Sequence, residues 1–195
     1  MKLLVKIPMT VPNGLFLSHD FITSEEEKSI TQWLDNQQWS TALQRRTQHY
    51  GYEYDYKSKI PKPTIPMSGP ILDISNRISK AGLMNPTQCI INEYFHNQGI
   101  APHTDSPMFG PIVIGVTLGD PCNMIFQNDT EKFVAFLPPR SLLLLKDEVR
   151  NLWKHSIPKT EKIILPTGEM MNKNKNYRRI SITYRTVIQG LELSE

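Results

Sequence analysis

Three residues in the second half of the chain have the types and spacing of a metal site. His103 and Asp105 form a His-x-Asp pair, and His155 follows an apolar strand and a polar turn further along. On an extended strand, residues two apart project to the same side, so both side chains of the pair can reach one ion. Two imidazoles and one carboxylate on one face of an octahedron leave three positions open, which suits non-haem iron(II) oxygenases. We therefore predict that these residues bind one iron(II) and form the catalytic set. The competing interpretation is a solvated loop position for His103 and a partly buried one for His155.

Two arginines near the end of the chain lie six residues apart in a segment that alternates like a strand. Arg179 and Arg185 therefore face the same side, with Ser181 and Thr183 between them. Two cations aimed at one interior are costly to bury, and a small dianion between them would remove that cost. 2-Oxoglutarate is such a dianion, and a guanidinium binds a carboxylate through two parallel hydrogen bonds. An edge strand with two exposed arginines is the alternative.

A further polar pair, Asn92 and Tyr94, lies upstream and could add neutral hydrogen bonds to the same wall. Taken alone, the pair also fits an ordinary amphipathic strand. Taken in chain order with the other motifs, it resembles the AlkB family of dioxygenases. The matching motifs are Asn92-x-Tyr94, His103-x-Asp105, His155 and Arg179-x-Ser181-x-x-x-Arg185. The resemblance runs from about Phe21 to Val187 and is strongest from Ile90 to His155, including Pro138-Pro139-Arg140-Ser141-Leu142-Leu143.

The resemblance implies a double-stranded β-helix (jelly-roll) core and an iron centre held by the His-x-Asp pair and the later histidine. It further implies that Arg179 pairs with the distal carboxylate of 2-oxoglutarate, helped by Tyr94. Arg185 and Asn92 would then lie near the carboxylate that chelates iron. Ser181 departs from the pattern, because the bacterial prototype has a longer amide residue there. Arg178 precedes Arg179 directly, but the six-residue spacing to Arg185 favours Arg179.

The chemistry that this resemblance implies is a coupled oxidation. Iron(II) is the cofactor, with 2-oxoglutarate and O2 as co-substrates, and the keto acid is decarboxylated to succinate while a C–H bond of the substrate is hydroxylated. On an N-methyl group, the hydroxylated product loses formaldehyde. The resemblance therefore implies oxidative demethylation or hydroxylation of a modified base in nucleic acid.

The segment from Arg45 to Tyr56 resembles the family's nucleotide-recognition lid. Its cationic side chains could contact phosphates, and its tyrosines could stack on a base drawn out of a helix. The candidate phosphate contacts are Arg45, Arg46 and His49, and the candidate stacking residues are Tyr50, Tyr52 and Tyr54. Lys57, Lys59 and Lys62 extend the basic stretch. The alternative is a tyrosine-rich hairpin packed on the core, followed by solvated lysines.

Two helices and a series of strands must position these residues. Ser24 caps a predicted helix, with Glu27 three residues on, and a second helix is predicted over Pro70 to Leu83. The alternating tyrosines predict a strand or hairpin over Arg45 to Tyr56, and Lys57 to Pro66 is predicted as a loop. Strands are predicted over Cys89–Phe95, Ile112–Leu118, Asn123–Gln127, Lys132–Phe136, Ser141–Leu145 and Arg179–Val187, with a polar, mobile loop over Gly168 to Asn176. Many short strands with two supporting N-terminal helices indicate an α+β fold with a sandwich or jelly-roll core.

Length and composition set the remaining expectations. The 195 residues suit one domain, which we expect to span 1–195, with a lid-like segment at 45–62 and a catalytic core at 89–187. The net charge of +3 permits a polyanionic partner without requiring one. The two cysteines fit free thiols in a reducing compartment. The first residues are broken too soon by Pro8 for a signal peptide, and no run is long enough to span a membrane. We therefore expect an intracellular monomer, in cytoplasm or nucleus.

The substrate stays open at this level. The expected partner is DNA or RNA, single-stranded or with a flipped base. The same chemistry on a protein side chain is the first alternative, and a catalytically silent binding module of the same fold is the second. The complete set of candidate ligands argues against the silent module, and the basic stretch weakly favours nucleic acid over protein.

Overall fold

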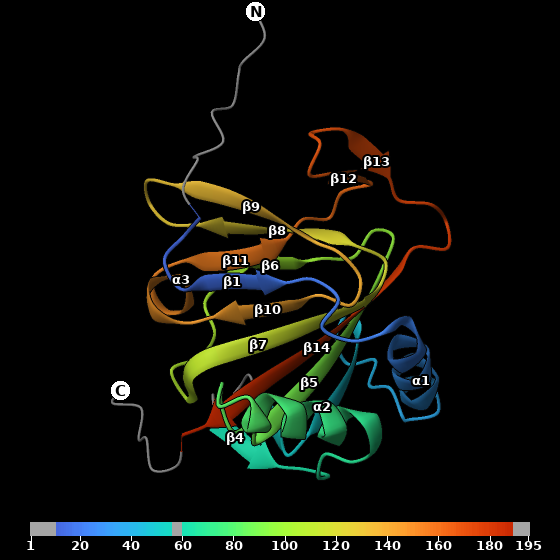
Figure 1. Ribbon diagram of the computed structural model, residues 1–195, viewed down its shortest axis with the longest axis vertical. Helices are drawn as coiled ribbons and strands as arrows, with labels where there is room; N and C mark the ends of the chain where they lie inside the picture. Colours follow the sequence, from blue (N-terminus) through green and yellow to red (C-terminus); the bar gives the residue numbers. More distant parts are fainter. Residues whose placement is uncertain (1–10, 56–59, 189–195) are drawn as a thin grey trace, which may run out of the picture.

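Two antiparallel sheets form the core of the protein (Figure 1). The computed structural model describes residues 11–55 and 60–188. The larger sheet contains, in spatial order, β1 (Leu15–Ser18), β10 (Leu142–Leu145), β7 (Phe109–Gly119), β14 (Arg178–Val187), β5 (Gln88–Phe95) and β2 (Arg46–Tyr50). The smaller sheet contains β6 (Ile100–His103), β11 (Lys154–Ile157), β8 (Cys122–Gln127) and β9 (Lys132–Leu137). This arrangement confirms the predicted α+β fold with a double-stranded β-helix core.

Each face of the larger sheet buries its own apolar cluster, because successive residues of a strand point to opposite faces. On the outer face, Ile114 and Val116 of β7 pack with the helices α1 (Ser24–Asp35) and α2 (Gly69–Lys80). On the inner face, Val113 of β7 packs with Phe126 of β8, between the two sheets. The helices therefore cover one side of the large sheet and leave the other side to the small sheet and the pocket between them.

Both N-terminal helices were predicted, but the cap of the first was misplaced by one residue. The Thr23 side chain accepts a hydrogen bond from the Glu26 backbone N–H at 3.1 Å, and Glu26 accepts one from the Thr23 N–H at 2.8 Å. Ser24 is already the first helical residue, and its hydroxyl donates to Glu25 instead. In α2, the predicted apolar stripe is buried, and Ile71 also accepts a hydrogen bond from the Tyr184 hydroxyl at 2.8 Å. A short third helix, α3 (Asp147–Asn151), was not predicted.

All six strands predicted downstream of residue 88 are present, whereas the tyrosine segment differs from the expected single strand or hairpin. A bend at Gly51, where φ is 73°, divides it into β2 and β3 (Tyr52–Asp55). β2 joins the large sheet beside β5, and β3 pairs with β4 (Ile60–Pro63), which lies inside the predicted loop. Tyr56, Lys57 and Lys59 lie outside the described residues.

The predicted loop over Gly168 to Asn176 is also partly a strand. β13 (Met170–Asn172) pairs with β12 (Lys162–Ile164) to form a small hairpin, seen beside the upper sheet in Figure 1. Both cysteines are buried and free, as expected. None of the described helices has the length and apolar character needed to cross a membrane. The predictions for the first ten residues lie outside the described part of the chain.

Candidate active site

The three predicted metal ligands meet at the edge of the small sheet. His103 ends β6 and His155 lies on β11, and the two are direct cross-strand partners with ring centroids 4.3 Å apart. The turn before β6 permits this pairing, because a Cβ on Gly99 would lie only 2.2 Å from the Ile157 carbonyl oxygen. Only glycine fits at this close approach of two backbones. One potential ligand atom from each of His103, Asp105 and His155 lies within 4.8 Å of the others.

Asp105 reaches this cluster from a loop rather than from the expected strand, because β6 ends at His103. The loop is held by Arg150 of α3, which donates to the backbone carbonyls of Asp105 at 3.1 Å, Ser106 at 2.9 Å and Phe109 at 3.1 Å. One oxygen of the Asp105 carboxylate accepts a hydrogen bond from Arg185. The other oxygen, Oδ2, is buried with no hydrogen-bond partner and lies 3.9 Å from Nε2 of His155.

The protonation states of the cluster suit a divalent cation. Burial lowers the pKa of His155 to about 4, so its ring is neutral at pH 7, the form that binds metals. Burial alone raises the pKa of Asp105, but Arg185 and the neighbouring cationic groups outweigh it, and the carboxyl pKa lies below its ordinary value. His103 contacts the Ala101 carbonyl through Nδ1 at 2.8 Å, which leaves Nε2 for a ligand. Two imidazoles and an ionised carboxylate with one orphaned oxygen fit an iron(II) ion.

A pocket between the two sheets extends inward from this cluster. Arg179 lies on its floor, 1% exposed, and donates to the Thr117 hydroxyl at 3.1 Å. Its Nε and one terminal nitrogen are buried without a hydrogen-bond partner, and its guanidinium lies 5.4 Å from the Tyr94 ring centroid. A buried guanidinium with two unsatisfied donors is costly unless an anion binds it. The pocket is therefore suited to a carboxylate.

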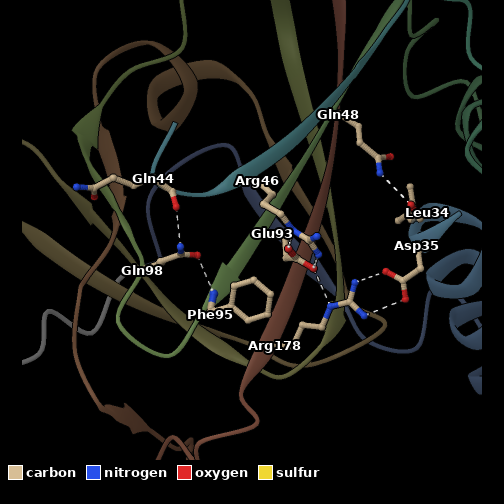
Figure 2. A network of polar contacts seen from close by, with 9 residues as sticks. All are labelled: Leu34, Asp35, Gln44, Arg46, Gln48, Glu93, Phe95, Gln98 and Arg178. Atoms are coloured by element: carbon tan, nitrogen blue, oxygen red, sulfur yellow. Dashed lines mark hydrogen bonds and ion pairs between the residues drawn. The ribbon is translucent and has the colours of Figure 1, made fainter. Parts of the chain in front are cut away.

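The other predicted co-substrate residues line the same pocket. Arg185 lies on β14 with Arg179, and Asn92 of β5 is the cross-strand partner of Ser181. Arg178 points elsewhere: it pairs with Asp35 of α1 and with the fully buried Glu93 of β5, as Figure 2 shows. Of the two adjacent arginines, Arg179 is therefore the one that lines the pocket, together with Arg185.

A wider groove opens above the metal cluster, and it contains only part of the predicted lid. Arg45 and Tyr54 line it, and the Tyr54 ring lies 5.7 Å from that of Phe109. Arg46 faces away and pairs with Glu93 (Figure 2), while Tyr50 is 2% exposed in the core. His49 is half-buried, and burial lowers its pKa. His49 and Tyr52 do not line the groove either. Substrate contacts by these four residues stay predictions, and the position of each side chain does not favour them.

Comparison with known proteins identifies the family. Residues 15–185 match the model of the 2OG-Fe(II) oxygenase superfamily. The chain belongs to this superfamily. As a member, it is a 2-oxoglutarate-dependent dioxygenase with Fe(II) as cofactor and O2 as second co-substrate.

The relatives place this oxygenase among AlkB-like proteins. It is 32% identical over 189 residues to the uncharacterized protein L905 of Acanthamoeba polyphaga mimivirus, covering 91% of this chain and 86% of the relative. It is 31% identical over 214 residues to the alkylated DNA repair protein ALKBH8 homolog of Arabidopsis thaliana, covering 94% of this chain but only 61% of that protein. The structure of OsALKBH1 superposes with a TM-score of 0.70 at 15% identity, covering 91% of this chain and 98% of that one, which shows a shared fold.

Several residues at the site of this oxygenase were not predicted. Thr117 bonds the pocket cation, and Arg150 holds the loop of Asp105. Lys159 lines the groove and donates to the Gln44 side chain at 3.1 Å. Lys159 lies four residues after His155, which is a weak signal for a site residue. The sequence gives no comparable signal for Thr117 or Arg150. The role of Thr117 depends on strand pairing, and that of Arg150 depends on a helix that the sequence pattern did not indicate.

Proposed function

We propose that this oxygenase oxidises a modified base in nucleic acid, with His103, Asp105 and His155 holding the iron. The observation that carries the proposal is the orphaned Asp105 Oδ2 beside two histidines, together with the buried Arg179 guanidinium in the same pocket, two of whose nitrogens have no hydrogen-bond partner among the described residues. A divalent cation satisfies the first group and a dicarboxylate satisfies the second. When bound, the iron supplies the oxygen chemistry that hydroxylates a C–H bond.

Each pocket residue has a distinct role in this proposal. Arg179, with Thr117 and Tyr94 beside it, binds the distal carboxylate of 2-oxoglutarate. Arg185 and Asn92, nearer the metal ligands, orient the keto-acid end, and Ser181 adds a short hydroxyl contact on the same wall. Apolar side chains from both sheets, including Leu137 of β9 and Leu143 of β10, line the same pocket and limit access of water to the co-substrate.

Nucleic acid is the proposed substrate because of the cations at the groove. Among the described residues, Arg45 and Lys159 hydrogen-bond to neutral amides, those of Asn92 and Gln44, and pair with no carboxylate. In contrast, Arg46 pairs with a carboxylate and faces away from the groove. A cation without a carboxylate partner is available to a phosphate. The name of the Arabidopsis relative, an alkylated DNA repair protein homolog, agrees with this class of substrate. We infer that residues 89–187 carry the catalysis, and that the 45–62 segment contributes to the groove.

A screen by mass spectrometry tests the proposal. The protein is incubated with Fe(II), 2-oxoglutarate and ascorbate, and offered methylated DNA oligonucleotides, methylated RNA oligonucleotides or methylated peptides. The expected result is a mass loss or an added oxygen on an oligonucleotide, matched by succinate. Oxidation confined to peptides would move the substrate to protein, and absence of succinate with every substrate would indicate a silent module.

A further inference from the structure

Arg45 connects the substrate groove to the co-substrate pocket. Its Nε donates to the side-chain oxygen of Asn92 at 2.7 Å. Asn92 is 7% exposed and lines both cavities, whereas Arg45 lines only the groove. The two residues come from neighbouring segments of the large sheet, since β2, which begins directly after Arg45, pairs with β5.

This bond decides which end of the Asn92 amide faces the pocket. A guanidinium has only donors, so it must bond the amide oxygen and not the NH2 group. The NH2 group is then directed away from Arg45, and no described residue accepts a hydrogen bond from it. A carboxylate has only acceptors and needs a donor there. If the amide turned over, its oxygen would face the carboxylate and repel it.

The neighbouring residue keeps Arg45 on this side of the sheet. Arg46 is held on the opposite side by Glu93, which is fully buried and also bonded by Arg178 (Figure 2). The guanidinium of Arg46 also lies 4.9 Å from the Trp39 ring centroid. Arg45 lies in the bend directly before β2, so the anchored Arg46 limits the directions open to the Arg45 side chain, and the one observed is toward Asn92.

We propose that Arg45 is a positioning residue for 2-oxoglutarate: it fixes the Asn92 amide with its NH2 group toward the keto-acid carboxylate. This inference rests on the proposed function, because it takes the inner pocket to be the 2-oxoglutarate site. It differs from a simple phosphate contact, since Arg45 then affects the co-substrate even when no nucleic acid is present.

Two substitutions separate orientation from charge. Arg45→Gln carries an amide nitrogen the same number of bonds from Cα as the arginine Nε, so it can donate to Asn92 without the charge. Arg45→Leu removes both donor and charge. Binding of 2-oxoglutarate is measured by calorimetry on the full chain loaded with Mn(II), without substrate. The Kd is expected to rise about tenfold in Arg45→Leu and to stay within about twofold of the unmodified protein in Arg45→Gln. Equal weakening in both variants would mean that charge alone acts, and would overturn the proposal.

A double-mutant cycle locates the effect on Asn92. Asn92→Ala should weaken 2-oxoglutarate binding, and adding Arg45→Leu to it should cause no further loss. Additive losses would contradict the proposal. Lys159→Ala is the matched control, because it removes a groove cation that does not contact Asn92, and its Kd for 2-oxoglutarate should not change. A circular-dichroism melt confirms that each variant is folded.

If the unmodified Mn(II) protein binds no 2-oxoglutarate, the proposed function and this inference fall together. If it binds and Asn92→Ala weakens binding while Arg45→Leu does not, only the role of Arg45 is overturned.

Discussion

Asp105 is bonded through one oxygen to Arg185 and leaves the other unpaired beside His155. Asp105→Asn keeps the shape of the side chain but removes the charge that a divalent cation requires. Metal uptake and turnover should both be lost, since two imidazoles and an uncharged amide remain. The measurements are equilibrium dialysis with Mn(II) and release of succinate in the presence of Fe(II). Full metal occupancy in this variant would show that the ligand set is wrong.

The adjacent arginines 178 and 179 should behave in opposite ways. Arg179→Ala leaves the distal carboxylate without its partner in a buried pocket, at a cost of about 3–5 kcal/mol, so the KM for 2-oxoglutarate should rise at least about a hundredfold. Arg178→Ala removes the bridge between Asp35 and Glu93, and should lower the melting temperature while leaving that KM unchanged. Steady-state kinetics and thermal melts distinguish the two. A KM that responds to Arg178→Ala alone would assign the pocket to the wrong arginine.

These side chains were also the most predictable part of the molecule. The types and spacing of His103, Asp105 and His155 indicated a metal cluster, and the six-residue interval from Arg179 to Arg185 indicated a shared pocket wall; the structure brings both sets together. Tyr50 shows why the residues that contact the substrate were harder to predict from the sequence. Its place in the alternation made it a candidate stacking residue, but β2 pairs with β5 and Tyr50 packs toward α1, with its ring 6.0 Å from that of Trp33.

At the scale of elements, the N-terminus of α1 lies one residue earlier than the sequence pattern predicted. The segment contains two overlapping capping-box patterns, Thr23 with Glu26 and Ser24 with Glu27, and the structure uses the first. Thr23→Ala should therefore lower the free energy of unfolding by about 1 kcal/mol. Ser24→Ala is the control and should change it much less, because the Ser24 hydroxyl makes an exposed hydrogen bond to the Glu25 side chain and caps no helical N–H among the described residues. Urea unfolding measures both, and a larger effect of Ser24→Ala would restore the original boundary.

The short helix α3 has a different task, which is to hold the metal-binding loop. Arg150 is 5% exposed and bonds three backbone carbonyls around Asp105. Arg150→Met retains much of the apolar stem but frees the loop, so metal affinity should fall by about tenfold or more, as for other partners that orient ligands. Titration with Mn(II) measures this. Arg150→Lys should rescue it only partly, because one ammonium cannot reproduce the planar fork. Unchanged affinity in Arg150→Met would show that the loop holds itself.

At the scale of the whole molecule, the order of the strands was beyond prediction from one sequence. Periodicity identified the individual strands from Cys89 onward, but pairing is a long-range property that local pattern does not encode. The tyrosine segment, predicted as a strand or a hairpin, shows this: it does form strands, but they do not pair with each other, because β2 pairs with β5 and β3 pairs with β4. The consequence for function is that one predicted lid divides into a sheet edge that packs against the core and a small outer hairpin near the groove.

Because the predicted lid is divided in this way, only some of its cations line the groove, and we expect those to contact nucleic acid. The salt dependence of nucleic-acid binding tests this expectation. Each phosphate contact on a single strand contributes about 0.7 to the slope of log affinity against log salt concentration, through release of counterions. Arg45 and Lys159 line the groove and have no carboxylate partner in the described part of the chain, so the double variant Arg45→Gln, Lys159→Gln should reduce the slope by about 1.4. Arg46→Gln is the matched control: Arg46 forms an ion pair with Glu93, and the slope should not change.

Fluorescence anisotropy of a single-stranded oligonucleotide at several salt concentrations measures the slope for the unmodified protein, the double variant and the control. A slope that falls with Arg46→Gln and not with the double variant would place the nucleic acid on the opposite face of β2, and binding without any salt dependence would argue for a substrate other than nucleic acid.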